Sequence, residues 1–257
     1  MDDDALRTQA AALSARLKHA NRLLFITGAG LSAESGLPTY RGVGGLYADA
    51  EAETEQGMPI EVALSGPVFR RQPEVTWHHI ARLEQGVRNA MPSAAHALIA
   101  ALERSHEVVV LTQNVDGLHR AAGSSRVIDI HGDCHELLCT RCPHRETRTD
   151  YEGLDVPPRC PRCGAVVRPD VVLFEEMLPS HKLEALWYEL DLGFDAYFSI
   201  GTSSLFPYIS APILDAARRG RLTVEINPEA TDVSSVVGHR FATGAGRALS
   251  AIFAPGD

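Results

Sequence analysis

The sequence lacks a surplus of basic residues, a membrane-length apolar run and a recognisable targeting segment. It holds 24 basic against 33 acidic side chains, which gives a net charge of −9 over 257 residues. Such a charge suits nucleic acid poorly, so we expect no direct nucleic-acid partner. No apolar run approaches the about 20 residues that cross a bilayer, and the acidic start MDDDALRTQA has no apolar core for a signal peptide. These absences predict a cytoplasmic protein without a membrane partner.

Cysteine is also scarce, and four of the five cysteines stand in two tight pairs. Cys139 and Cys142 form one Cys-x-x-Cys unit, Cys160 and Cys163 form the other, and 17 residues (143 to 159) lie between them. Two pairs at this spacing can close on one tetrahedral ion, and zinc prefers four thiolates in that geometry. Because all four sulfurs would be used, we expect a structural zinc. Two redox-type turns or two disulfides are the alternative, and Cys134 is expected to be a buried spectator thiol.

Short apolar runs alternate with helical patterns along most of the chain. Hydrophobic residues make up 45% of the sequence and charged residues 22%, as in a globular protein. The apolar runs predict buried strands at 23–26, 108–111, 127–130, 196–200 and 222–226, and helical patterns lie at 4–19, 93–104, 181–190 and 211–219. Strands that alternate with helices indicate a parallel sheet with helices on both faces. We therefore predict an α/β fold with a Rossmann-like parallel sheet.

Two segments interrupt this alternation. Residues 41–90 come early in the chain, and residues 132–170 carry the paired cysteines. We interpret both as insertions that form one small zinc-ribbon and helical domain. The Rossmann-like part then comprises approximately 1–40, 91–131 and 171–257.

A glycine-rich turn follows the first predicted strand. Gly28-Ala29-Gly30 precedes Ser32, and bare glycines there let a backbone approach a phosphate at a helix N-terminus. The chain lacks the third glycine of G-x-G-x-x-G, since the next one is Gly36, and lacks a second strand ending in an acid about 20 residues on. An ordinary dehydrogenase is therefore disfavoured. A tight turn that binds no ligand is the alternative.

Polar turns follow the other predicted strands. In an open parallel sheet, ligands bind beyond the carboxyl ends of the strands, so we expect these turns to converge. His131 is the one obvious general base among them, with a pKa near the working range. Helix capping by Asn114 and Asp116, and a purely structural His131, are the alternatives. The turns are Gln113-Asn114-Val115-Asp116, His131-Gly132, Gly201-Thr202-Ser203 and Asn227.

Together these motifs resemble the sirtuin family, the NAD-dependent protein lysine deacylases. The resemblance is carried, in order and spacing, by residues 28–41 (GAGLSAESGLPTYR), 112–119 (TQNVDGLH), His131-Gly132, the four paired cysteines, 168–174 (RPDVVLF) and 201–203 (GTS). It covers roughly residues 15–253. It implies a single bacterial-type catalytic domain over residues 1–257, with NAD bound between the Rossmann-like part and the zinc ribbon.

The resemblance also implies a role for each matching residue. His131 is the expected general base, and Asn114 and Asp116 are the other expected catalytic residues. NAD is consumed: the acyl-lysine amide oxygen attacks the ribose carbon as nicotinamide leaves, and the products are nicotinamide, free lysine and O-acyl-ADP-ribose. The partner is an acylated lysine in a protein or peptide, and the oligomeric state stays open. The expected cofactor-binding residues are Gly28, Ala29, Gly30, Ser32, Glu34, Thr39, Tyr40, Arg41, Gln113, Asn114, Val115, Asp116, Gly201, Thr202, Ser203, Asn227 and Ala245.

The chain departs from the family pattern on the substrate side, where Val172, Phe174, Glu175, Phe206 and Ile80 are the expected binding residues. The family commonly has glycine in place of Glu175. We expect this position to lie in a strand that pairs with the peptide, and the Glu175 side chain should hinder that pairing. It tends to have valine in place of Phe206 on the facing strand. If these two side chains close the cleft, the chain is an NAD glycohydrolase or mono-ADP-ribosyltransferase. A non-enzymatic, NAD-sensing zinc-ribbon module is the third possibility.

A further departure concerns the acyl group. Family members that remove succinyl or malonyl groups carry Tyr-x-x-Arg in the helix after the cofactor loop, where the arginine pairs with the acyl carboxylate. Ile80 and Leu83 align with those two positions and predict an apolar wall. A shift of one residue would offer His79 and Arg82 instead.

Overall fold

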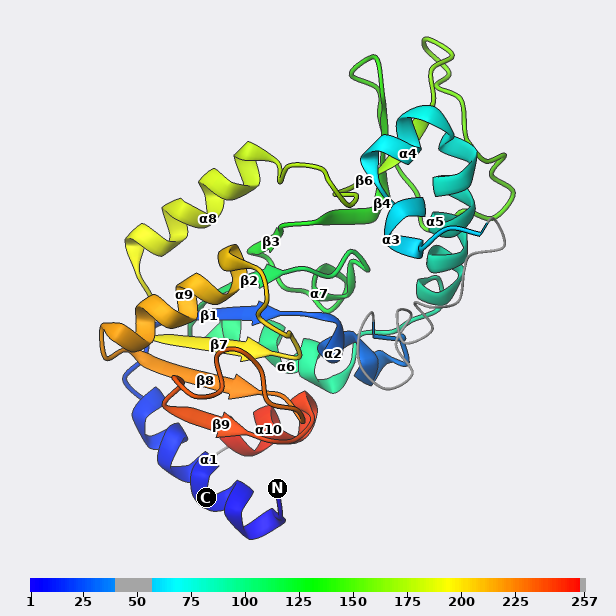
Figure 1. The fold of residues 1–257 in the computed structure, drawn as a ribbon. Helices are drawn as coiled ribbons and strands as arrows, with labels where there is room; N and C mark the ends of the chain where they lie inside the picture. Colours follow the sequence, from blue (N-terminus) through cyan, green and yellow to red (C-terminus); the bar gives the residue numbers. More distant parts are fainter. Residues whose placement is uncertain (40–56, 255–257) are drawn as a thin grey trace.

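A six-stranded sheet forms the centre of the larger part of the molecule (Figure 1). The computed structural model describes residues 1–39 and 57–254, and in that part of the chain the strand order is β3-β2-β1-β7-β8-β9. All neighbouring pairs are parallel, so the five strands predicted from apolar runs are confirmed. β9 escaped prediction because it is short and only Phe241 in it is buried. The strands are β1 (Arg22–Thr27), β2 (Glu107–Thr112), β3 (Val127–Asp129), β7 (Ala196–Ile200), β8 (Leu222–Ile226) and β9 (His239–Phe241).

The chain changes direction across the sheet between β1 and β7. From β1 it moves to β2 and β3 on one side, and later to β7, β8 and β9 on the other. The carboxyl ends are level, with Thr27 opposite both Thr112 of β2 and Ile200 of β7. Such a switch point opens a crevice in which open α/β sheets bind their ligands. The loops after these three strands therefore meet at one place.

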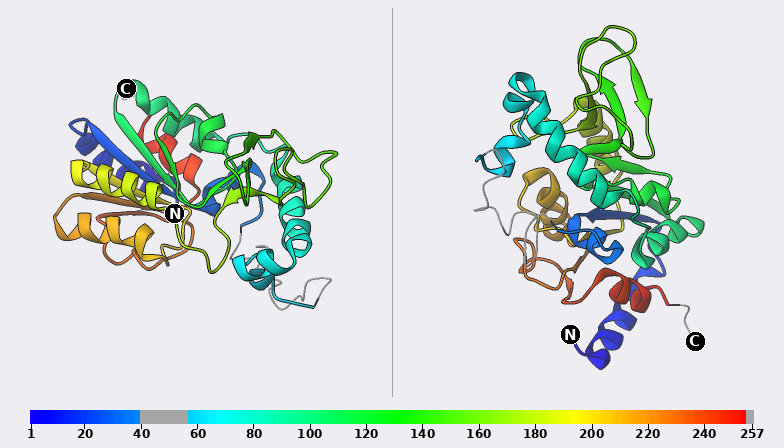
Figure 2. Two further views of the ribbon diagram at one scale, coloured as in Figure 1. Left: turned by 90° about the horizontal axis from the view of Figure 1, so that it is seen from above. Right: turned by 90° about the vertical axis from the view of Figure 1, so that its right-hand side faces the viewer.

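Helices cover both faces of this sheet, as predicted (Figure 2). On one face lie α1 (Asp3–Leu17), α6 (Ala94–Ala101) and α10 (Ala245–Ile252), and on the other α8 (Ser180–Leu192) and α9 (Pro207–Arg218). Leu23 and Phe25 of β1 pack toward the first set, and Leu24 and Ile26 toward the second. Because both faces are apolar, the strands read as continuous apolar runs. Within the described ranges, no helix has the length and apolarity of a membrane span.

Short helices complete this part of the chain. They are α2 (Ala29–Ser32), the 3-10 helix η1 (Ala33–Ser35), the 3-10 helix η2 (Leu102–Arg104) and α7 (Leu118–Ala121). α2 and α7 lie near the carboxyl edge of the sheet, beside the switch point (Figure 1). They therefore lie close to the predicted ligand site.

Two segments form a smaller part with its own apolar cluster. One holds α3 (Ile60–Ala63), α4 (Gly66–Arg71) and α5 (Pro73–Val87), and the other an antiparallel sheet in the order β5-β4-β6. Its strands are β4 (Gly132–Cys139), β5 (Arg145–Thr147) and β6 (Val167–Val171). Trp77 of α5 is fully buried, donates from Nε1 to the Val167 carbonyl at 2.8 Å and lies 5.5 Å from the Tyr151 ring. The two segments therefore share one cluster of buried residues, and their division into a separate domain stays a prediction.

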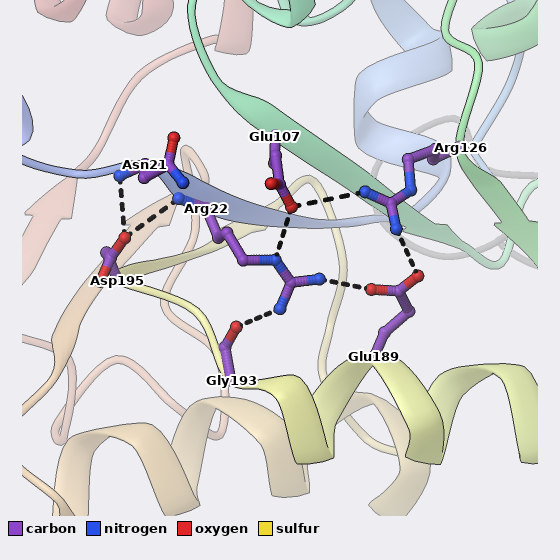
Figure 3. Close-up of polar contacts among 7 residues, drawn as sticks. All are labelled: Asn21, Arg22, Glu107, Arg126, Glu189, Gly193 and Asp195. Atoms are coloured by element: carbon purple, nitrogen blue, oxygen red, sulfur yellow. Dashed lines mark hydrogen bonds and ion pairs between the residues drawn. The ribbon is translucent and has the colours of Figure 1, made fainter.

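A charged network ties α8 to the amino edge of the large sheet (Figure 3). Arg22, at the start of β1, donates to Glu107 at 3.0 Å, to Glu189 of α8 at 2.6 Å and to the Gly193 carbonyl. Its guanidinium carbon lies 4.6 Å from the centre of the Phe194 ring. The Arg22 and Glu189 side chains are only 14% and 13% exposed, so water screens this pair little.

Replacing Arg22 by methionine should lower the free energy of unfolding by about 2 kcal/mol, because it removes charged hydrogen bonds from a largely buried carboxylate. Urea denaturation measures this change. The matched control is Arg218→Met, since Arg218 pairs with Asp215 where the two side chains are 75% and 44% exposed. That control should change stability by less than about 0.5 kcal/mol. Equal losses in the two variants would contradict the role given to the network.

Candidate functional site

Three glycines let the loops after β1 and β7 touch at the switch point. Gly30 donates its N–H to the Gly201 carbonyl at 2.8 Å. A Cβ on Gly28 would lie 2.8 Å from Thr202 Cβ, and one on Gly30 would lie 2.7 Å from Gly201 Cα. Gly201 has φ +58°, in the left-handed region that favours glycine. Packing between the two loops therefore requires these glycines, a reason that the sequence pattern alone did not supply.

Ser32, Asn114 and Asp116 form a buried hydrogen-bonded network beside this contact. Ser32 Oγ donates to Asp116 Oδ2 at 2.6 Å, while Asn114 Nδ2 donates to Ser32 Oγ at 2.8 Å and to the Gly28 carbonyl at 3.0 Å. Asp116 Oδ1 also accepts from the N–H of Leu118, the first residue of α7, at 3.0 Å, whereas the N-cap of that helix is Gly117. Because these polar groups pair with one another, each side chain is held in one orientation.

The loop after β2 is also joined to the loops after β7 and β8. Gln113 Nε2 donates to Thr202 Oγ1 at 2.7 Å, and Asn227 Nδ2 donates to the Thr202 carbonyl at 3.2 Å. Thr202 is buried, whereas Ser203 beside it is exposed. The carboxyl ends of these strands therefore converge, and the binding roles of their residues stay predictions.

Of the other residues expected to bind the cofactor, Glu34 and Ala245 lie at the start of α10. Glu34 accepts hydrogen bonds at 3.0 Å from a backbone N–H in the first turn of α10, where Ala245 is buried. Thr39 is the last described residue before the gap in the described chain. Tyr40 and Arg41 lie outside the described residues.

His131 lies between β3 and β4, with both ring nitrogens in hydrogen bonds. Nδ1 is 3.0 Å from the Gln113 carbonyl oxygen, and Nε2 is 2.7 Å from the Tyr208 hydroxyl. Since a carbonyl only accepts, Nδ1 carries the proton and Nε2 accepts from Tyr208. Burial lowers the pKa of His131, and the hydrogen bond to the Gln113 carbonyl opposes this in part. A neutral imidazole with an unprotonated Nε2 is the form that a general base requires.

The segment predicted to receive a peptide lies after β6. Val172 donates its N–H to the His131 carbonyl at 2.8 Å, and Phe174 pairs with the segment just before α4. Glu175 has φ +64°, so it lies in a left-handed turn and the strand expected there is wrong. A left-handed backbone disfavours residues with a Cβ, which is a local reason for glycine at this position.

The expectation of a strand around Phe206 is also wrong. Phe206 is the N-cap of α9, because Pro207 suits the first turn of a helix and starts it there. The Phe206 ring stacks on the Tyr208 ring at 5.5 Å and meets the His131 ring edge-on at 6.3 Å. We call His131, Phe206 and Tyr208 the three-ring group. The sequence analysis missed Tyr208, since nothing in a local pattern links it to His131.

A cavity lies between the Ser32–Asn114–Asp116 network and α5. Ile80, Leu83 and Arg82 all line it, whereas His79 is buried elsewhere. The cavity is therefore lined by Ile80 and Leu83 of the first alignment with the family and by Arg82 of the alignment shifted by one residue. Its lining comprises Ala29, Ser32, Leu37, Pro38, Ile80, Arg82, Leu83, Glu84, Gly86, Val87, Asn114, Val115, Asp116, Cys134, Pro169 and Val171.

The lining includes two residues with reactive or charged side chains, Glu84 and Cys134, to which the sequence analysis gave no role in a site. Glu84 is buried and accepts from Arg88 at 2.7 Å and 3.1 Å, so a paired carboxylate stands in a largely apolar wall. Cys134, expected to be a spectator, faces the same cavity. Only the packing of β4 against α5 brings these side chains together.

The four paired cysteines converge at the far end of the small sheet. The Sγ atoms of Cys139 and Cys163 are 3.5 Å apart, those of Cys142 and Cys160 are 3.6 Å apart, and all four lie within 4.8 Å of one another. A zinc ion with bonds of about 2.3 Å holds tetrahedral sulfurs about 3.8 Å apart. None of the four is in a disulfide. This group can therefore hold one zinc ion, remote from the cavity and without an open coordination position.

A buried histidine pair lies behind the loop that follows β1. His119 of α7 lies 2.9 Å from Thr27 Oγ1 through Nε2, and its ring is 4.8 Å from that of His96 in α6. Burial lowers the pKa of His119 to about 3, with the neighbouring His96 adding to the effect. Burial also lowers the pKa of His96. Both imidazoles are therefore neutral in the folded protein near pH 7.

Fold and site together define an α/β protein with a ligand crevice at the switch point of its sheet and an inserted four-thiol module. The family model described as "Sir2 family" matches residues 28–206. A Pseudomonas syringae pv. tomato protein named NAD-dependent protein deacylase 2 is 52% identical over 223 residues, covering 85% of this chain and 89% of that protein. Its Pseudomonas aeruginosa namesake is 48% identical, covering 88% and 89%. The chain belongs to the Sir2 family, which confirms its resemblance to the sirtuins.

Solved structures agree with this assignment. A variant of a Sir2 homologue in complex with ADP-ribose matches with a TM-score of 0.82 at 33% identity, covering 98% of this chain and 95% of that one. A Sir2 complex with a p53 peptide and NAD⁺ matches with a TM-score of 0.77 at 26% identity, covering 91% and 93%. The likeness therefore extends over both the large sheet and the small cysteine-bearing part.

Metal analysis of the pure protein should give about one zinc per chain, as a single four-thiol site requires. Cys142→Ser should lower the zinc content toward zero and reduce thermal stability as well. The reason is that the free energy of zinc binding, which stabilises the folded state, is lost with the ligand. Cys134→Ser is the matched control and should keep its metal, since Cys134 lies outside the four-thiol group. A Cys142→Ser protein of unchanged stability but without zinc would refute the structural role.

The free energy of unfolding should fall as the pH falls below 6.5. His119 in the unfolded chain binds a proton in that range, whereas its pKa in the folded protein is lowered to about 3. His119 alone removes up to about 1.4 kcal/mol per pH unit across this window. Denaturant unfolding between pH 7 and pH 4.5 measures the slope. His119→Gln, which can still contact Thr27 but does not titrate, should show a shallower fall. Equal slopes in the two proteins would exclude His119 as a cause.

Proposed function

We propose that this chain is an NAD-dependent protein lysine deacylase that forms nicotinamide, O-acyl-ADP-ribose and the free lysine. The observation that carries the proposal is His131, neutral and with Nε2 as a proton acceptor, at the carboxyl edge of the sheet. The Ser32–Asn114–Asp116 network lies at the same edge. Relatives named NAD-dependent protein deacylase and Sir2 complexes with ADP-ribose and with a peptide support it.

The residues at the switch point fit NAD. When bound, NAD supplies a ribose carbon whose bond to nicotinamide can break. We propose that the exposed Ser203 and the half-buried Asn227 hold the adenosine half, whereas Asn114 and Asp116 hold the nicotinamide ribose from the cavity side. Their buried hydrogen bonds fix these groups before the ligand arrives, which reduces the cost of ordering them.

His131 would act as the general base on a ribose hydroxyl. Its Nδ1–H is held by the Gln113 carbonyl, so the ring is oriented and the proton goes to Nε2. The acyl-lysine would approach past Val172 and Phe174 on one side and Phe206 on the other. The zinc would serve only to hold β4, β5 and the cysteine loops together. Because none of the five cysteines is in a disulfide, we further propose a reducing compartment, the cytoplasm, as its place of action.

One experiment separates this function from its rivals. Nicotinamide release is measured with NAD alone and with NAD plus an acylated peptide. Release that requires the peptide supports deacylation. Release without the peptide would support a glycohydrolase or ADP-ribosyltransferase, and no release in either case would support a non-enzymatic NAD sensor.

His131→Ala should reduce peptide-dependent nicotinamide release and acyl transfer by about 100-fold to 10,000-fold, because the general base is lost. NAD binding, measured by calorimetry, should change little. His106→Ala is the control, since His106 lies just before β2 at the opposite edge of the sheet. Near-normal turnover in His131→Ala would remove His131 from the mechanism.

Neutral acyl groups should be favoured over succinyl by at least about tenfold in kcat/KM, because Ile80 and Leu83 form an apolar wall and the Glu84 carboxylate beside them repels an acyl carboxylate. The double variant Ile80→Tyr/Leu83→Arg should narrow this preference by supplying an arginine to the cavity. Arg82→Met is the control and should leave the preference unchanged. A preference for succinyl that Arg82→Met abolishes would show that Arg82 binds the carboxylate of the acyl group.

A further inference from the structure

The base nitrogen of His131 is already occupied by another side chain. Nε2 has one lone pair, and the Tyr208 hydroxyl donates to it at 2.7 Å. The other ring nitrogen donates to the Gln113 carbonyl. A ribose hydroxyl therefore finds no free acceptor on His131 while Tyr208 stays in place.

Tyr208 is held where it meets His131 by its own segment. It is the second residue of α9, directly after Pro207, and its ring stacks on Phe206 at an interplanar angle of 13°. Burial raises the pKa of Tyr208 to about 12, so its hydroxyl keeps its proton and acts as a donor near pH 7. The bond to Nε2 is thus stable until another donor replaces it.

The charges around His131 do not replace this contact. The positive charge of Lys182 in α8 contributes to lowering the pKa of His131, but its ammonium pairs with Asp129 Oδ1 at 2.9 Å and with the Asp129 carbonyl at 2.8 Å. Within the described part of the chain, the hydrogen-bond donor at His131 Nε2 is the Tyr208 hydroxyl. Tyr208 therefore occupies this lone pair before any ligand binds.

We infer that Tyr208 is a positioning residue for the base: its hydroxyl holds Nε2 of His131 in the NAD-free protein and yields that place to the ribose hydroxyl when NAD binds. This inference rests on the proposed function. Tyr208 is half-buried, so water can take over its hydroxyl once it turns away. NAD binding then includes the loss of one hydrogen bond within the protein, which reduces the observed affinity.

Tyr208→Phe removes the hydroxyl and keeps the stacked ring. Calorimetry with NAD should show binding about threefold to tenfold tighter than in the unchanged protein, because the bond to His131 no longer has to break. The turnover rate should change by less than about threefold. Tyr188→Phe, an exposed tyrosine on α8, is the control and should leave both values unchanged.

Nitrogen NMR of the NAD-free proteins supplies a second measurement. The Nε2 resonance of His131 should show a hydrogen-bonded acceptor in the unchanged protein and a free acceptor in Tyr208→Phe, with Nδ1 little altered. Unchanged or weaker NAD binding, or an unmoved Nε2 resonance, would overturn the inference. Turnover that falls by about 100-fold or more would overturn it too, by placing Tyr208 in the proton transfer itself. Tighter binding without any deacylation would keep the inference and reject the proposed function.

Discussion

The close approach of two loop backbones at the switch point is the constraint on which the rest of the site depends. Gly30 and Gly201 meet through a 2.8 Å backbone hydrogen bond, at separations that no Cβ would tolerate. This contact sets the Gly28 carbonyl where Asn114 can donate to it, and Asn114 in turn orients Ser32. Because only glycine permits this backbone contact, the glycines determine, through successive hydrogen bonds, where the polar side chains of Asn114 and Ser32 lie.

The electrostatics of the site follow from the same burial. Asp116 stays useful as an acceptor because Ser32 and the Leu118 N–H compensate its carboxylate. His131 and His119 lose affinity for protons because little water reaches them, yet the consequences differ. At His131 a neutral ring with an acceptor nitrogen can serve as a base, whereas neutral His119 supports Thr27 behind the loop. One physical effect therefore serves both chemistry and structure.

The small part of the molecule provides the other wall of the site. α5 buries Trp77 against the small sheet in its first half, and Ile80, Leu83 and Arg82 line the cavity further along the same helix. The four-thiol group lies at the far end of the same sheet and can hold its loops together. The cavity wall and the four-thiol group are therefore connected through the packing of this part.

Local patterns in the sequence were enough to predict the five main strands, the helices on both faces, the cysteine group and the position of His131 just after a strand of the large sheet. Those features depend on periodicity and spacing between near neighbours, which the chain displays directly. The left-handed turn at Glu175, the start of α9 at Pro207 and the Tyr208 contact could not be predicted in this way. Tyr208 and His131 are 77 residues apart, and nothing local marks them as partners. The sequence determined which chemical groups are present, and the tertiary structure alone decided which of them meet, because those contacts arise from the packing of distant segments.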